Sequence, residues 1–104
     1  MYNIQNDLLK ASFNAMGAEL TSLYSKQYDL DYLWNGDPAF WGKHSPVLFP
    51  LVGGLKENTY YLDEKAYTLS RHGFAREKDF SVSSSSAESI SFVLKSDASS
   101  LLSY

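Results

Sequence analysis

The sequence predicts an antiparallel all-β fold on the basis of three observations. Apolar and polar residues alternate with a period of two in several segments, as they do in strands with one buried face. Turn-forming residues separate these segments. No segment keeps the apolar spacing of a helix over several turns. We therefore expect six or more strands, several of them joined as hairpins.

The first two strands are predicted at residues 9–13 and 18–24, where apolar and polar side chains alternate. Asn6-Asp7 and the segment 14–17, which ends in a glycine, provide turn residues at their boundaries.

Residues 31–50 predict a structured loop, because three prolines and two glycines exclude a long regular element. Within it, Asp37-Pro38 predicts one short helical turn over residues 37–41, with the aspartate as N-cap and the proline at the first helical position. The four Trp and Phe rings of this loop could shape a site or anchor the loop to a core, which is the more common use of such rings.

Two hairpins are predicted in the second half of the chain. Residues 57–62 and 65–69 are separated by two polar residues, without the glycine that such turns favour. Residues 79–83 and 89–95 form the second pair, and the serine run 83–86 is interpreted as its loop.

Composition restricts the classes of function. No linker divides the 104 residues, so residues 1–104 are predicted to belong to one domain. The net charge of −3 argues against a nucleic-acid partner, and no apolar run is long enough to span a membrane. The chain has no cysteine, which excludes disulfides and cysteine-ligated metals. The first residues do not resemble a signal peptide, so a cytoplasmic location is expected.

The most informative segment is Arg71-His72-Gly73-Phe74-Ala75-Arg76, which holds both arginines of the chain and one of its two histidines. A histidine can donate and accept hydrogen bonds, and a guanidinium offers a planar fork of donors. The glycine allows a tight bend that would point the flanking side chains the same way. The segment could form one wall of a polar binding site. Alternatively, His72 satisfies a backbone group in a turn and the arginines are solvated surface charges.

Other chemistries find little support in the sequence. His44 and His72 are far apart and have no accompanying carboxylate cluster, so no metal site is expected. Residues 51–56 lack the spacing of a phosphate-binding P-loop, and no serine lies in a Gly-x-Ser-x-Gly turn.

Five segments in order resemble the N-terminal part of the aldose 1-epimerase (galactose mutarotase-like) superfamily. They lie at residues 17–23, 32–38, 41, 45–53 and 72–76. The Pro-x-Leu-Phe-Pro block at 46–50 and the His-Gly-Phe-Ala-Arg block at 72–76 are specific in combination.

The resemblance implies a large antiparallel β-sandwich of the galactose-mutarotase supersandwich type, of which this chain would be the N-terminal portion. It also implies an enzyme that interconverts the α and β anomers of an aldose by general acid–base chemistry, without a metal or cofactor. By the same resemblance, His72 matches a histidine that contacts the sugar. Arg76 matches a position that lines the pocket, or that helps to hold a phosphate in the related hexose-6-phosphate epimerases.

Two departures from the family pattern bear on activity. Gly54 stands where the family commonly has a substrate-binding arginine, and Lys56 is the nearest positive charge in that segment. The family's acid histidine and base glutamate lie later than residue 104, so the chain alone is expected to be inactive. The alternatives are a non-catalytic carbohydrate-binding or regulatory module and, less favoured, a small β-domain used only for protein interaction.

The expected ligand is a sugar or sugar derivative. An incomplete sandwich exposes strand edges and an apolar face, so we expect the chain to associate with a second copy of itself or with a C-terminal remainder.

Overall fold

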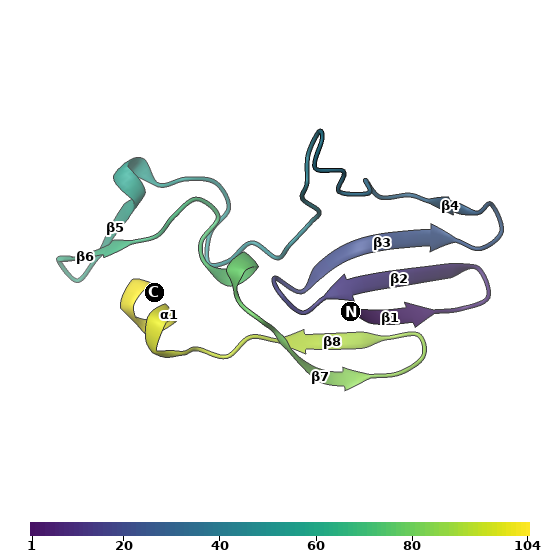
Figure 1. Ribbon diagram of the computed structural model, residues 1–104. Helices are drawn as coiled ribbons and strands as arrows, with labels where there is room; N and C mark the ends of the chain where they lie inside the picture. Colours follow the sequence, from purple (N-terminus) through teal and green to yellow (C-terminus); the bar gives the residue numbers. More distant parts are fainter.

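A four-stranded antiparallel sheet forms one end of the molecule in the computed structural model, which describes residues 1–104 (Figure 1). Its strands lie in the order β1 (Tyr2–Gln5), β2 (Leu9–Asn14), β3 (Glu19–Ser25) and β4 (Leu30–Asp31). The structure confirms the strands predicted at 9–13 and 18–24.

Local hydrogen bonds explain the first turn of this sheet. Oδ1 of Asn6 accepts from the backbone N–H groups of Leu8 and Leu9, both at 2.8 Å, so the side chain replaces a backbone turn. This turn returns the chain along β1, a strand that the sequence did not predict. The pairing of β2 with β3 shifts by one residue between Ser12 and Phe13, as in a β-bulge.

The predicted hairpin in the middle of the chain is β5 (Thr59–Leu62) and β6 (Lys65–Thr68), preceded by a 3-10 turn at Lys56–Asn58. Its turn residues have φ values of 50° and 66°, which gives the left-handed geometry of tight hairpins without a glycine. The rings of Tyr60 and Tyr67 stack across the hairpin with centroids 5.2 Å apart.

The second predicted hairpin is β7 (Ser81–Ser85) and β8 (Ile90–Val93), which lies beside β1 (Figure 1). The backbone N–H of Gln5 donates to the carbonyl of Ala87, and Phe92 packs edge-on against Tyr2. The loop comes later than predicted: most of the serine run belongs to β7, where Ser84 and Ser85 pair with Ser91 and Ile90 of β8.

The loop after β4 contains the helical turn predicted at 37–41, although the turn is too short to count as a helix. The carbonyl of Asp37 accepts from the N–H groups of Phe40 and Trp41, and its Oδ1 caps the N–H of Ala39 at 2.9 Å.

A short helix, α1 (Ala98–Ser103), follows β8 and was not predicted. Asp97 and Ser100 form a reciprocal capping box at its start. The backbone N–H of Ser100 and the ammonium of Lys78 hold the pKa of Asp97 well below its usual range. Neither this helix nor the 3-10 turns is long and apolar enough to cross a membrane.

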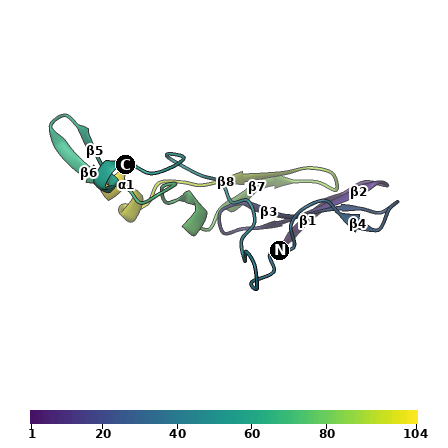
Figure 2. The ribbon, with the colours of Figure 1, turned by 90° about the horizontal axis from the view of Figure 1, so that it is seen from above.

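The chain forms an extended layer rather than a filled core (Figure 2). It measures 56 × 34 × 16 Å, and its radius of gyration of 16.8 Å exceeds the roughly 13 Å of a compact domain of this size. Leu69 and Ala75 are the only buried hydrophobic residues. Large apolar side chains such as Phe40, Val52 and Leu102 are at least three-quarters exposed, so most of the apolar surface has nothing packed on it.

Candidate functional site

Two segments run side by side at the centre of the candidate site: residues 49–54, and residues 70–75, which contain the predicted motif. The carbonyl of Phe49 accepts from the N–H groups of Phe74 and Ala75 at 3.0 and 3.1 Å, and Phe49 pairs with Gly73 in a parallel bridge. This pairing places two blocks that are about twenty residues apart in the sequence against each other.

His72 holds Gly53 with two hydrogen bonds. The backbone N–H of His72 donates to the carbonyl of Gly53, and the backbone N–H of Gly53 donates to Nδ1 of His72, both at 2.8 Å. His72 has a φ of 65°, so its backbone is left-handed and its ring turns back toward Gly53.

This contact selects the tautomer of the neutral ring. A nitrogen that accepts a hydrogen bond carries no hydrogen, so Nδ1 of His72 is bare and the neutral ring has its hydrogen on Nε2. Nε2 makes no hydrogen bond within the chain, and the side chain is half-buried. One nitrogen of His72 therefore supports the turn, while the other is a free donor for a ligand.

The close approach of residues 49–54 and 70–75 requires a glycine at position 73. Its φ is 70°, and a methyl group built on it would lie 2.3 Å from the carbonyl oxygen of Phe49. The close approach of the two segments therefore depends on a residue without a side chain.

The side chain of Arg71 packs on Gly54, the residue after Gly53. A methyl group built on Gly54 would lie 3.4 Å from Nη2 of Arg71 and 3.6 Å from its Cζ. The guanidinium of Arg71 thus covers Gly54, beside the Gly53 that His72 holds.

Arg76 lines a hollow of its own, and His72 is not among the residues that line it. Arg76 belongs to the 3-10 turn Ala75–Glu77 and lines a polar hollow of about 380 Å³ with Glu19 and His44, among other residues. Glu19 accepts a hydrogen bond from the backbone N–H of His44 at 3.2 Å. The structure therefore does not bring the two predicted site residues to one cavity, and the role of Arg76 stays a prediction.

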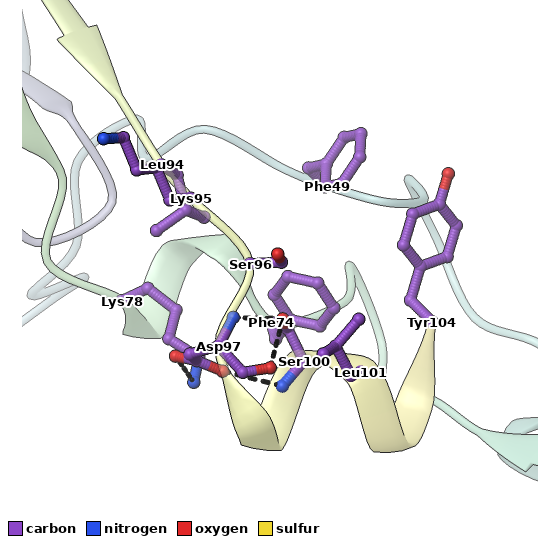
Figure 3. A pocket seen from close by; sticks show the side chains of 10 residues that line it. All are labelled: Phe49, Phe74, Lys78, Leu94, Lys95, Ser96, Asp97, Ser100, Leu101 and Tyr104. Atoms are coloured by element: carbon purple, nitrogen blue, oxygen red, sulfur yellow. Dashed lines mark hydrogen bonds and ion pairs between the residues drawn. The ribbon is translucent and has the colours of Figure 1, made fainter.

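A largely apolar hollow lies next to α1 (Figure 3). It has a volume of about 300 Å³, and the rings of Phe49, Phe74 and Tyr104 form much of its wall. Of its three charged residues, Lys78 and Asp97 pair with each other at 3.0 Å, and Lys95 makes no ion pair. Because few polar groups are free to meet sugar hydroxyls, this hollow is better explained as unfilled core than as a sugar site.

A third hollow, of about 500 Å³, lies in the aromatic loop and is lined by residues that include Trp34, Trp41 and His44. The indole N–H of Trp34 donates to the carbonyl of Trp41 at 2.5 Å, and this hydrogen bond links two parts of the loop. Trp34 thus has a structural role in this loop.

The chain is an antiparallel β-layer in which a Pro-x-Leu-Phe-Pro segment crosses a His-Gly-Phe-Ala-Arg turn. Its fold is that of galactose mutarotase-like proteins. Two solved structures have this fold. A galactose mutarotase related enzyme from Lactobacillus acidophilus is 42% identical with a TM-score of 0.94, and a galactose mutarotase-like protein from Lactobacillus casei is 40% identical with a TM-score of 0.96. They match 99% and 100% of this chain.

The sequence comparisons agree. The family model for aldose 1-epimerase matches residues 1–104. The plasmid-encoded protein LacX of Lactococcus lactis subsp. lactis is 33% identical over 97% of the chain. The chain belongs to the aldose 1-epimerase family.

The chain spans about one third of the length of these relatives. It covers 35% of LacX, and 34% and 35% of the two solved chains. The layer described above thus matches a part of the fold that the relatives have.

Proposed function

We propose that the protein to which this chain belongs binds an aldose and interconverts its α and β anomers, with this chain as the N-terminal portion. A base removes the proton of the anomeric hydroxyl while an acid protonates the ring oxygen. The bond between the anomeric carbon and the ring oxygen breaks, the aldehyde rotates, and the ring closes on the other face. The acid and the base are proposed to lie outside these 104 residues.

The observation that carries the proposal is the state of His72. Its Nε2–H is a free donor on a ring that the backbone of Gly53 holds in place. Such a group can bind and polarise a sugar oxygen without taking part in the proton transfers. Family membership and the names of the two solved relatives support the same reaction class. We propose that Arg76 also contacts the ligand in the parent protein, from the separate hollow that it lines with Glu19 and His44.

A second candidate function is favoured by Gly54, which has no side chain to donate to a substrate. In that case the parent protein would be a carbohydrate-binding or regulatory module. Titration of the full-length protein with sugars separates the two: binding without anomer exchange supports the module, whereas exchange supports the enzyme.

We also propose that the exposed apolar surface of this layer is covered by further polypeptide of the parent or by a second copy. The 104-residue chain alone is expected to form oligomers or aggregates, because burying apolar surface is favourable by about 25 cal/mol per Å². Light scattering over a concentration series measures this. A soluble monomer that persists at high concentration contradicts the proposal.

A further inference from the structure

We propose that Arg71 is a specificity-determining, ligand-binding residue, and that its guanidinium fills the position that the missing side chain of Gly54 leaves open. It would bind a pair of adjacent oxygen atoms of the sugar, from vicinal hydroxyls or from a phosphate ester. This inference rests on the proposed sugar-binding function of the His72 wall.

The guanidinium of Arg71 lies against the backbone of the neighbouring segment. An arginine on an exposed turn has many conformations that point into solvent. Here its head lies on the backbone of Gly54, with Nη2, Cζ and Nε at 3.4, 3.6 and 3.9 Å from where a Cβ would be. A methyl group at position 54 would be in van der Waals contact with the guanidinium, so the head of the arginine packs directly on the glycine.

The side chains of Arg71 and His72 lie close to each other. Arg71 and His72 are consecutive, and they lie against the consecutive residues Gly53 and Gly54. In an extended strand, consecutive side chains point to opposite faces. The left-handed backbone at His72 breaks this alternation, so both side chains lie over the same short segment.

The hydrogen-bond donors of Arg71 are free. Arg71 makes no hydrogen bond and no ion pair, and the one ion pair of the chain joins Lys78 and Asp97. Together with Nε2–H of His72, the guanidinium gives a wall of donors only. Such a wall complements the acceptor oxygens of a sugar, and the planar fork of an arginine suits two adjacent ones.

A relocation experiment tests this in the full-length protein, with four variants: R71Q, R71K, G54R and the double variant G54R/R71Q. We expect R71Q to raise KM for the anomer exchange by about tenfold or more, because charge-assisted hydrogen bonds are lost. Lysine cannot supply a planar fork, so R71K should recover little of this. G54R alone should also bind poorly, because two guanidinium groups compete for one space. The double variant should recover affinity, because it keeps one guanidinium at the same place.

A comparison of substrates shows whether the oxygen atoms that Arg71 binds belong to hydroxyls or to a phosphate. If vicinal hydroxyls are bound, R71Q has a smaller effect on a deoxy sugar that lacks one of them than on the parent aldose. If a phosphate is bound, the effect is larger on the aldose 6-phosphate than on the free aldose. Thermal unfolding is the structural control, and R71Q should leave it unchanged because Arg71 is exposed.

The outcomes separate this inference from the proposed function. A wild-type protein that turns over sugar, with KM unchanged in R71Q, overturns the role of Arg71 alone. A double variant that binds sugar more weakly than both G54R and R71Q overturns the claim that a guanidinium at this place binds the ligand. A wild-type protein that neither binds nor interconverts any sugar overturns both proposals.

Discussion

Replacing His72 by asparagine is expected to leave the fold intact and to lower kcat/KM for anomer exchange by about 10- to 100-fold in the full-length protein. The asparagine Oδ1 can take the place of Nδ1 and accept from the N–H of Gly53. Asparagine also tolerates the left-handed backbone at this position, where φ is 65°. What it cannot replace is the donor at Nε2.

His72→Gln is the matched control, because it tests the other nitrogen. A glutamine can place an N–H near the position of Nε2, but it leaves the N–H of Gly53 without the acceptor that lies 2.8 Å away. We expect this variant to lose about 1–2 kcal/mol of stability and to keep more of the activity than the asparagine variant.

Anomer exchange and thermal unfolding, measured on both variants, check this division of roles. Equal activity of the asparagine variant and the wild type means that His72 only supports a turn. An asparagine variant that unfolds as easily as an alanine variant contradicts the proposed contact with Gly53.

Replacing Gly73 by alanine is expected to cost more stability than any other single change considered for this chain, about 3 kcal/mol or more. The left-handed φ of 70° penalises any side chain, and the new methyl group would lie 2.3 Å from the carbonyl oxygen of Phe49. Relief would require the two segments to separate, which breaks the hydrogen bonds from Phe74 and Ala75 to that oxygen.

Gly53→Ala is the control for this second prediction. Gly53 also has a positive φ, of 92°, but no atom lies within 4 Å of a methyl group built there. Its cost should therefore be the conformational one alone, about 1–2 kcal/mol. Denaturant unfolding of the full-length protein measures both variants. Equal losses of stability in the two variants would contradict a steric clash between a side chain at position 73 and the carbonyl of Phe49.

Much of the fold could be predicted from the sequence, because strands leave a local signal. The alternation in Leu9–Asn14 and Glu19–Ser25 reflects one half-buried face, and Asp37 marks its turn by residue type. Helix α1 gives no such signal: it is six residues long and begins at a capping box rather than with an apolar stripe. β4 has only two residues, too few for any period.

The site was less predictable, because its decisive contacts join residues that are distant in the chain. The motif identified His72 as a candidate, but the sequence did not show that Nδ1 meets Gly53. Lys56 was the nearest positive charge to Gly54 in that segment, whereas in space the guanidinium of Arg71 lies there. Only the crossing of the two segments reveals these pairs, and no local pattern predicts it.

The central claim is that this chain contributes a sugar-binding wall to an anomer-converting enzyme. NMR exchange spectroscopy between the α and β anomers of glucose and galactose, with the full-length protein and with the 104-residue chain, tests it most directly. We expect exchange well above the buffer background with the full-length protein, a large loss of it in the His72→Asn variant, and background exchange with the chain alone. Background exchange with the full-length protein, or exchange above background with the 104 residues alone, would contradict the account.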